Sequence, residues 1–328
     1  MKYDFIVIGG AVEDVLIYTN DGVVIDNKQD LAKPRLLGFE YGGKVSVDSV
    51  ETSFGGGAAN VAVAISRLGF KVACISAVGR DQRGLEIISN FKKNKVSTSL
   101  VKVIKGQPTG FSAIIAGKDH EHVAFPVRGA NNFMHLDKSD VRALKASKWI
   151  YLTSLSGEWR EILDKIFLND SAKIAWNPGQ LQLKAGLIAL RPYLEKTELL
   201  MLNLDESVEL LLTNKKNKKY LKKISIEVLG SELLKFGPKR VLITDGANGA
   251  LAMSRSLTEQ FKPEPISNVI NTLGMGDSFG ASFVSGLELY NGDVIQSLKL
   301  AGLNASRVAK SHGAQPGLLF KKEIHEKK

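Results

Sequence analysis

Apolar residues along this chain follow two alternating patterns, short continuous runs and longer stretches with helical spacing. Phe5-Ile6-Val7-Ile8 is a continuous run that ends at Gly9-Gly10, as expected for a strand buried on both faces of a parallel sheet. Residues 60–68 instead repeat apolar side chains every three or four positions, and Gly69 follows as a helix-ending glycine. Strands that alternate with helices predict a parallel sheet covered by helices on both faces.

This alternation continues along most of the chain. In chain order it predicts strand 71–77, helix 84–92, strand 148–153, helix 158–168, strand 172–176, helix 183–192, strand 198–202, helix 205–213, helix 226–236, strand 240–245, strand 249–253, helix 276–290 and helix 293–312. The chain has 328 residues, 44% of them hydrophobic, which is enough for a large core. We therefore predict one α/β domain over residues 1–328, with helices on both faces of a mostly parallel central sheet.

Two long stretches interrupt the alternation. Residues 15–54 are rich in Asp, Gly and Lys, with short β-like pieces at 22–25 and 44–47. Residues 99–128 alternate apolar and polar side chains in the manner of strands. Connections of this length without structure of their own are uncommon. We therefore predict that segments 15–54 and 99–128 form one small β-sheet lid outside the main sheet.

Composition narrows the setting and the partners. The chain has one cysteine, Cys74, which cannot form an internal disulfide, so a reducing, cytoplasmic location is expected. No apolar run approaches the ~18 residues of a membrane span, and we expect no membrane partner. The net charge is +10, but the densest basic block, Lys215-Lys216-Asn217-Lys218-Lys219, has no interleaved aromatics except the neighbouring Tyr220. We interpret this block as a solvated surface and expect no nucleic-acid partner.

The segment Asn271-Thr272-Leu273-Gly274-Met275-Gly276-Asp277 carries the strongest chemical signal. It leads directly into residues 278–287, which have the pattern of a helix. Free N–H groups and the helix dipole favour an anion such as phosphate at a helix N-terminus, and glycines let the backbone approach it. A carboxylate beside that phosphate can accept a proton, which suggests phosphoryl transfer to a hydroxyl. Taken alone, the segment also fits an ordinary loop with Asp in the first helical turn.

A second glycine-rich segment, Gly55-Gly56-Gly57-Ala58-Ala59-Asn60, precedes the first long helix. Its glycines permit backbone contact with a ligand, and Asn60 can cap the helix while offering an amide; a flexible turn with an N-cap is the alternative. The chain has neither the G-x-x-x-x-G-K-[ST] motif nor a G-x-G-x-x-G after the first strand. These absences exclude a P-loop enzyme and weigh against a nicotinamide enzyme.

In order and spacing, the motifs resemble those of the PfkB (ribokinase-like) family of carbohydrate and nucleoside kinases over nearly the whole chain. The motifs that carry the resemblance are Gly9 with Asp14, Gly55-Gly56 with Asn60, Val78-Gly79-Arg80-Asp81 with Gly84, Pro108-Thr109-Gly110, Gly129-Ala130-Asn131, Asn203-Leu204-Asp205-Glu206, Thr244-Asp245-Gly246 with Gly249, residues 271–277, and Asn304 with His312-Gly313-Ala314. The resemblance implies a ribokinase-like three-layer sandwich with a small β-sheet lid, and it implies ATP and Mg²⁺ as cofactors.

The resemblance also implies roles for individual residues. Asp277 would be the general base, beside an anion hole formed by the N–H groups of Gly274, Met275 and Gly276. The residues expected to bind the acceptor are Asp14, Gly55, Gly56 and Asn60. The residues expected to bind the nucleotide are Asn203, Thr244, Gly246, Gly249 and Asn304. Asn203 and Glu206 would hold Mg²⁺, partly through water.

The chain departs from the family pattern at several positions. Asn271 replaces the first Asp of its motif, which helps organise a monovalent-cation site in potassium-activated relatives, so we predict weak or absent cation activation. Met275 replaces a small residue, but its backbone N–H can still donate. Gly57 stands where ribokinases often have lysine, and Thr153-Ser154 stands where they have glutamate. The sequence therefore identifies the family more firmly than it identifies ribose.

We predict an ATP-dependent kinase that phosphorylates a hydroxyl of a sugar. Arg128 is a further acceptor-binding candidate, for an anionic group, although it could instead tie the lid to the core. A nucleoside kinase is the alternative within the family, since Trp176 and the lid aromatics Phe39, Tyr41, Phe111 and Phe125 would suit a base. A non-catalytic sensor of a sugar or nucleotide, and a nucleic-acid-binding protein, are the alternatives outside it. The expected partners are a small sugar or nucleoside and a second copy of the chain, in a homodimer through the lid.

Overall fold

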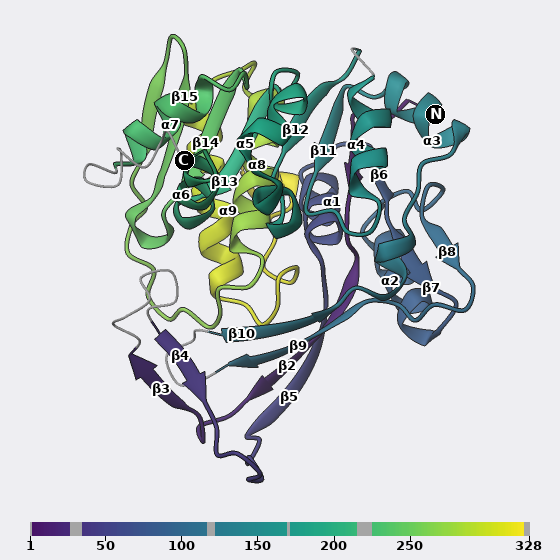
Figure 1. Cartoon of the computed structure of the whole chain (residues 1–328), viewed down its shortest axis with the longest axis vertical. Coiled ribbons are helices and arrows are strands. Elements are labelled where there is room, and N and C mark those ends of the chain that lie inside the picture. The colour runs from purple at the N-terminus through teal and green to yellow at the C-terminus, as the bar shows by residue number, and fades with distance from the viewer. Residues whose placement is uncertain (1, 27–34, 117–121, 169–170, 215–224, 325–328) are drawn as a thin grey trace.

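The computed structural model describes residues 2–26, 35–116, 122–168, 171–214 and 225–324, and within them the central sheet contains eight strands (Figure 1). From edge to edge these are β16 (Thr258–Phe261), β15 (Ala250–Ser254), β14 (Arg240–Thr244), β13 (Leu199–Asn203), β12 (Lys173–Trp176), β11 (Trp149–Leu152), β1 (Phe5–Ile8) and β6 (Val72–Ile75). The strands from β14 to β6 run parallel to their neighbours, whereas β15 and β16 are antiparallel at one edge. The predicted α/β class with a mostly parallel sheet is therefore confirmed.

Helices cover both faces of this sheet. One face carries α1 (Gly57–Arg67), α2 (Gln82–Lys93), α8 (Met275–Leu289) and α9 (Val294–Ala309). The other carries α3 (Lys138–Ala146), α4 (Trp159–Phe167), α5 (Gln180–Leu194), α6 (Leu204–Leu212) and α7 (Ile226–Leu234). Along β11, Trp149 and Tyr151 join the core under α1 and α8, while Ile150 and Leu152 join the opposite core. Burial on both faces explains why the strands read as continuous apolar runs.

The apolar pattern did not predict α3 or β16. Helix α3 begins after Asp137, whose carboxylate accepts the backbone N–H groups of Ser139 and Asp140. Only Asp140 and Leu144 are buried in this helix, so it has little apolar periodicity to detect. β16 has the sequence Thr-Glu-Gln-Phe and is held at the sheet edge by antiparallel pairing with β15. A cap and an edge pairing, rather than hydrophobic spacing, define these two elements.

A second, smaller sheet lies below the body in Figure 1. It contains, in order, β10 (His122–Val127), β9 (Phe111–Ala116), β2 (Val12–Tyr18) and β5 (Ser49–Gly55). The separate small sheet is thus present, but in the segment predicted at 99–128 its first strand starts at Phe111 rather than at residue 99. β8 (Lys102–Ile104) instead pairs with β7 (Ala77–Gly79), and β3 (Val23–Asp26) pairs with β4 (Arg35–Gly38). The β-like piece predicted at 44–47 has no strand, because pairing with β2 begins only at Ser49.

The two sheets meet where β1 continues through Gly9-Gly10-Ala11 into β2. Asn131, in the short turn Gly129–Phe133, is buried at this junction. Its Oδ1 accepts from the Ala11 N–H at 3.3 Å and from the Ser76 hydroxyl at 3.3 Å, and its Nδ2 donates to the Ala11 carbonyl at 3.1 Å. One side chain therefore satisfies both backbone groups of the residue at which the chain leaves the main sheet.

We expect Asn131→Ala to destabilise the fold, because it leaves the buried N–H and C=O of Ala11 without these partners. Each unsatisfied buried group costs about 1–3 kcal/mol, so the free energy of unfolding should fall by at least about 2 kcal/mol. Urea unfolding monitored by circular dichroism measures this change. Asn132→Ala, at the exposed neighbouring position, is the matched control. Equal stability of the two variants would show that the contacts at Ala11 contribute nothing.

Candidate active site

A cavity of about 220 Å³ opens where the central strands end and α8 begins. Asn203 and Thr244 are the last residues of β13 and β14, so the cavity lies at the carboxyl ends of parallel strands, where open α/β sheets bind ligands. The residues that line it are Tyr151, Asn177, Met201, Leu202, Asn203, Glu206, Leu242, Thr244, Gly274, Gly276, Asp277 and Gly280. Predicted residues from distant parts of the sequence therefore meet in one place.

The turn before α8 has the geometry of an anion site. Gly274 is the N-cap and has a φ of 69°, and a Cβ there would lie 2.4 Å from the Cβ of Ala314. Glycine is thus required both by conformation and by space. An added Cβ on Gly276 would meet nothing within 4 Å, which leaves this backbone open to a ligand. The Met275 side chain packs against the core under α1 and α8. Backbone N–H groups at this helix start can therefore face a phosphate, but the Met275 N–H also donates to the Thr272 carbonyl at 3.4 Å.

Asp277 lies in the first turn of α8 and is half-buried. Burial raises its pKa to about 6, and the hydrogen bond from Asn60 opposes this rise. The Nδ2 of Asn60 donates to Oδ2 of Asp277 at 2.9 Å, so one carboxylate oxygen is fixed by an amide from α1. A carboxyl with a pKa near 6 is ionised at neutral pH and is still a better base than an exposed aspartate.

Gln315 fixes the orientation of the Asn60 amide, a role that the sequence did not suggest. The Nε2 of Gln315 donates to Oδ1 of Asn60 at 3.1 Å, and Oε1 of Gln315 accepts from Asn90 Nδ2 at 2.8 Å. Because Oδ1 of Asn60 already accepts from Gln315, its Nδ2 is the end that faces Asp277. The only sequence signal was the position of Gln315 directly after the Gly313-Ala314 pair of the last family motif.

Asp14 lies on β2, at the base of the small sheet, and is buried. Burial raises its pKa to about 6, a hydrogen bond from Ser112 lowers it, and the charges of Asp277 and Glu13 raise it further. A Cβ on Gly55 would lie 1.7 Å from Oδ2 of Asp14, so only glycine allows this carboxylate its position. Asp14 lies against Gly55 and Asp277 lies 3.5 Å from a Cβ on Gly57, two residues further along, so the two carboxylates border one common region.

The two departures at Gly57 and Thr153 fall side by side in this region. A Cβ on Gly57 would lie 3.1 Å from the Cβ of Thr153 and 3.5 Å from Oδ1 of Asp277. The neighbouring glycine, Gly56, is the N-cap of α1 with a φ of 89°, and a Cβ there would meet the Gly10 carbonyl at 2.6 Å. Arg128 is exposed at the start of the turn that contains Asn131.

Asn203 and Glu206 form a reciprocal cap at the start of α6. The Oδ1 of Asn203 accepts from the Glu206 N–H at 2.7 Å, and Oε2 of Glu206 accepts from the Asn203 N–H at 2.9 Å. Burial raises the pKa of Glu206, the Asn203 N–H lowers it, and the charge of Asp277 raises it. This cap turns both side chains toward the cavity mouth and leaves Oε1 of Glu206 available to a ligand.

The predicted nucleotide residues differ in what they can offer. Thr244 lines the cavity, and Gly246 is exposed with nothing within 4 Å of an added Cβ. Gly249 has a φ of 105° and packs against the Phe261 carbonyl, so its glycine is a requirement of the fold. Asn304 is buried, and its amide donates to Ser282 at 2.7 Å and accepts from the Leu319 N–H at 2.9 Å. Its side chain therefore holds α9 to α8 and to the C-terminal segment.

Asn271 occupies the start of the anion-binding turn and is buried. Its Nδ2 donates to the Ser311 carbonyl, and its Oδ1 accepts from the Leu273 N–H at 2.9 Å. The backbone N–H of Ile270 also donates to the Ala309 carbonyl at 2.8 Å. An amide donor thus ties the turn directly to the segment after α9, and this position offers no carboxylate.

Trp176 is fully buried and packs against Phe167 and Tyr193, with ring centroids 5.8 Å and 6.3 Å away. It lies in the core on the far side of the sheet from α8, so stacking on a nucleobase, considered above, is wrong for this residue. Phe111 is half-buried under the Arg83 guanidinium, 5.0 Å from its ring centroid. The lid aromatics Phe39 and Phe125 are exposed.

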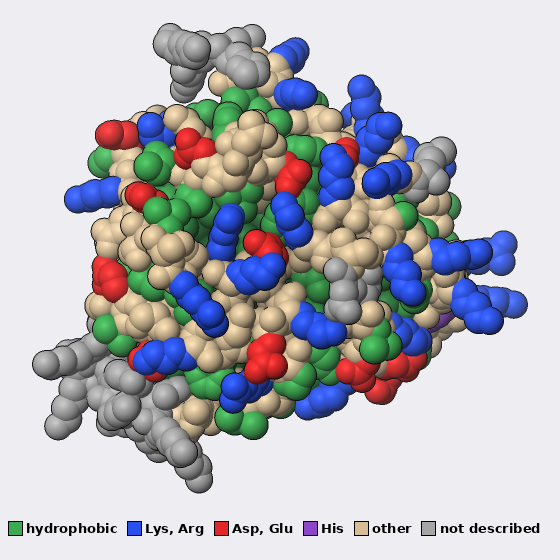
Figure 2. Space-filling model, turned by 90° about the horizontal axis from the view of Figure 1, so that it is seen from above, with side chains coloured by type: hydrophobic (Ala, Val, Ile, Leu, Met, Phe, Trp, Pro, Cys, Tyr) green, Lys and Arg blue, Asp and Glu red, His purple; other side chains and the backbone are tan. Residues whose placement is uncertain are grey.

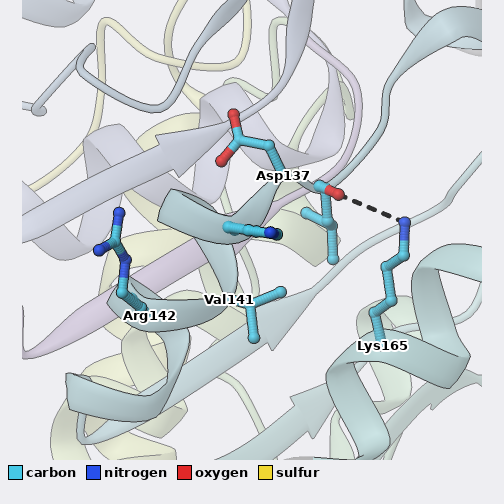
Figure 3. A pocket seen from close by; sticks show the side chains of 6 residues that line it. Asp137, Val141, Arg142 and Lys165 are labelled. Carbon is cyan, nitrogen blue, oxygen red and sulfur yellow. Dashed lines mark hydrogen bonds between the residues drawn. The ribbon is translucent and has the colours of Figure 1, made fainter.

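A second hollow, of about 710 Å³, lies beside α3 and is lined by Leu136, Asp137, Lys138, Val141, Arg142 and Lys165 (Figure 3). Two of its charged side chains, Asp137 and Lys165, are already engaged in holding the fold together. Asp137 caps α3 and pairs with Lys102 at 2.7 Å, and Lys165 donates to the Leu136 carbonyl at 3.3 Å. Because these contacts are structural, the smaller cavity at α8 is the candidate active site.

On the face shown in Figure 2, positive charge is dispersed rather than gathered in one patch. Figure 2 shows Lys and Arg side chains spread over one face, with Asp and Glu among them. The basic block at residues 215–219 lies outside the described residues. No helix in the described ranges combines the length and the apolar character that crossing a membrane requires.

Known proteins of similar sequence and fold are sugar and nucleoside kinases. A ribokinase of Dictyostelium discoideum is 25% identical, over 99% of this chain and 100% of its own length. Arabidopsis thaliana ribokinase, solved with ribose and ATP, has a TM-score of 0.78 at 19% identity and covers 99% of this chain and 98% of its own. Burkholderia thailandensis nucleoside kinase, solved with inosine, has a TM-score of 0.77 at 18% identity and covers 98% and 96%.

These structures confirm the predicted ribokinase-like fold, with its mostly parallel central sheet and its separate small sheet. The model of one family, described as pfkB family carbohydrate kinase, matches residues 22–320. This match covers most of the chain, including the turn before α8 and the Asn203–Glu206 cap. The chain therefore belongs to the pfkB family of carbohydrate kinases, as its motifs predicted.

Proposed function

We propose that this chain transfers the γ-phosphoryl group of ATP to a hydroxyl of a sugar, with Asp277 as the general base. One observation carries the proposal: Asp277 is a fixed, half-buried carboxylate in the first turn of α8, directly after an open glycine turn. Phosphoryl transfer to an alcohol needs such a base beside a phosphate site. The acceptor hydroxyl gives its proton to Asp277, its oxygen bonds to the γ-phosphorus, and ADP leaves as the bridging P–O bond breaks.

The α8 turn would stabilise the charge that develops on the transferred group. Its N–H groups carry the positive end of the α8 dipole, and Gly276 leaves room for phosphate oxygens to approach the backbone. Oδ2 of Asp277 is held by Asn60, which leaves Oδ1 to receive the proton. Positioning of the base and stabilisation of the phosphate thus come from adjacent residues of one turn.

Mg²⁺ fits this site through water rather than in a protein cage. Within the described residues no three His, Cys, Asp or Glu side chains converge as metal ligands. Oε1 of Glu206 has no hydrogen-bond partner in the part of the chain that the structure describes, while Oδ1 of Asn203 is engaged by the helix cap. Mg²⁺ commonly binds through one or two carboxylates, several waters and substrate phosphates. Mg²⁺ would be held by Glu206, which Asn203 positions through the helix cap, and it would neutralise charge on the nucleotide phosphates.

Several observations favour a sugar over a nucleoside as the acceptor. The curated relative named above is a ribokinase, and Trp176 is in the core, where it cannot stack on a base. Asp14, Asn60 and the Gly55-Gly56 backbone surround the acceptor side of Asp277 and suit small hydroxylated molecules. Gly57 and Thr153 lie side by side in space, where ribokinases often have a lysine and a glutamate. The loss of both charges favours a sugar other than ribose.

The test is acceptor-dependent release of ADP from ATP and Mg²⁺ over a panel of sugars and nucleosides. We expect a sugar to give the highest kcat/KM, and Asp277→Asn to lower kcat by roughly 10²–10⁴-fold, as expected for a positioned base. Glu161→Gln, which neutralises an exposed first-turn carboxylate of α4, is the matched control and should be fully active. A nucleoside as best acceptor would support the family alternative. Binding of a sugar without any turnover would support a sensor and overturn the proposal.

The pH dependence gives a second prediction for the same base. Because burial raises the pKa of Asp277 to about 6, kcat/KM should fall as the pH drops below about 6 and the base is protonated. Asp14 has a pKa near the same value, so the fall should exceed tenfold per pH unit once both carboxyls are protonated. An acid limb of kcat/KM centred near pH 4 would contradict the assignment.

The same pKa shift predicts an effect on stability. The carboxyl ionises near pH 3.8 in the unfolded chain but only near pH 6 in the fold, so the folded state is progressively destabilised as the pH rises between these two values. Asp277→Asn removes this cost and should therefore unfold no more easily than wild type at pH 7.

Monovalent-cation activation should be weak, because the Asn271 amide already donates to the Ser311 carbonyl. We expect rates in potassium chloride and in tetramethylammonium chloride of equal ionic strength to agree within about twofold. Asn271→Asp removes the donor and adds a charge beside that carbonyl, so potassium stimulation should appear in this variant. Tenfold stimulation of the wild type by potassium would contradict this account of Asn271.

Two further proposals concern the small sheet and the cellular setting. The exposed apolar side chains of the small sheet and its neighbours include Val23, Val24, Ile25, Leu36, Val50, Val123, Phe125 and Val127. An apolar face of this kind is typical of an interaction surface, and we propose that a second copy of the chain covers it. We also propose a reducing, cytoplasmic setting, in which the buried Cys74 remains a thiol.

We expect the small sheet to close on the acceptor, because Asp14 lies at its junction with the body. Amide hydrogen exchange in residues 12–18, 49–55 and 111–116 should slow when a competent sugar is added, more than in β14 and β15. Light scattering over a range of protein concentrations, in parallel, reports the dimer. If saturating sugar leaves exchange unchanged while dilution speeds it, the sheet is an interface and not a lid. No change in either experiment would exclude both roles.

A further inference from the structure

The hydroxyl of Tyr151 is a buried donor at the α8 cavity for which the reaction described above has no use. Tyr151 is the third residue of β11 and only 2% exposed, and it lines the cavity together with Glu206, Thr244 and Asp277. Its hydrogen-bond partner in the structure is the thioether sulfur of Met201, at 3.5 Å. Sulfur is a weak acceptor, so this buried O–H is poorly satisfied by the protein alone.

The fold makes room for this hydroxyl at the expense of a side chain on α8. A Cβ on Gly280 would lie 2.4 Å from the Tyr151 oxygen and 3.2 Å from the Met201 sulfur. Gly280 is buried inside α8, where glycine is less favourable to a helix than alanine by about 0.5–1 kcal/mol. A glycine at this position is therefore explained by the space that the hydroxyl needs.

The hydroxyl can act only as a neutral donor. Burial, and then the negative charge of Asp277, raise the pKa of Tyr151 well above its ordinary value, so the proton stays on the oxygen. Asp14 and Asn60, the acceptor-side residues, are not part of the cavity lining, whereas Glu206, Thr244 and the Gly274–Gly276 turn are. These are the residues assigned above to Mg²⁺, the nucleotide and the phosphate, so under the proposed function this cavity receives the phosphate end of the nucleotide.

We propose that the Tyr151 hydroxyl donates a hydrogen bond to an oxygen of the transferred phosphoryl group and is a further catalytic residue. This inference rests on the proposed kinase function. The bond would add a side-chain donor from β11 to the backbone donors of α8, on the side of the phosphoryl group that faces the sheet. No proton is transferred through it.

Tyr151→Phe tests the proposal, because it removes one oxygen and keeps the ring. We expect kcat to fall about 10- to 100-fold, the range for loss of one hydrogen bond to a charged group. The affinity for ADP, measured by calorimetry, should stay within twofold. The affinity for ADP with aluminium fluoride, which mimics the phosphoryl group in transfer, should fall by a factor similar to that of kcat. Tyr193→Phe removes an exposed hydroxyl bonded to Asp164 at 2.6 Å and is the matched control.

Gly280→Ala provides the second variant, since its Cβ displaces the hydroxyl without deleting it and alanine favours the helix. The same loss of fluoroaluminate affinity should appear in this protein, even if Tyr151→Phe folds poorly. Wild-type kcat and fluoroaluminate affinity in Tyr151→Phe would overturn the proposal, as would an equal loss of ADP affinity. A wild-type protein that turns over no sugar or nucleoside would instead refute the proposed function, because the fluoroaluminate comparison does not need an acceptor.

Discussion

A single carboxylate kept ionisable in a half-buried site is the constraint on which this active site depends. Burial of Asp277 disfavours its charged form and raises its pKa to about 6, and the hydrogen bond from the Asn60 amide limits the rise. With deeper burial the group would be neutral at physiological pH and could not accept a proton. With full exposure it would be ionised but weakly basic. The observed position lies between these limits.

This balance is maintained by residues from opposite ends of the chain. Asn60 comes from α1 and Gln315 from the segment after α9, and Gln315 in turn is held by Asn90 and, through its carbonyl, by the Arg67 guanidinium at 2.7 Å. In both Asn60 and Gln315 the amide oxygen accepts a hydrogen bond from a neighbour, so the amide nitrogen is the atom that donates onward to the next group. The base is thus oriented by the packing of α1, α2 and the C-terminal segment, and its geometry depends on the complete fold.

The sequence predicted those features that follow from local periodicity and from motif order. The buried strands, the covering helices and the position of Asp277 at a helix start all have such signals, and the fold and family predicted from them are confirmed. Long-range polar pairing has no comparable signal. Neither the occupation of the Asn304 amide by Ser282 and Leu319 nor the meeting of Tyr151 with Gly280 could be read from spacing. Trp176 was ambiguous for a different reason, because an aromatic at the end of a strand suits a ligand site and a core equally.

The two carboxylates near the acceptor belong to different sheets, and this connects catalysis to the position of the small sheet. Asp14 is carried by β2 and Asp277 by the body, and the charge of Asp277 raises the pKa of Asp14. Two ionised carboxylates repel each other in a partly buried space, which opposes approach of the small sheet. A polyhydroxylated acceptor can donate hydrogen bonds to both and offset that repulsion. The acceptor would then also be the molecule that stabilises the closed arrangement of the small sheet. A water molecule has fewer hydroxyl donors and is too small to reach both carboxylates, so it would stabilise this arrangement less.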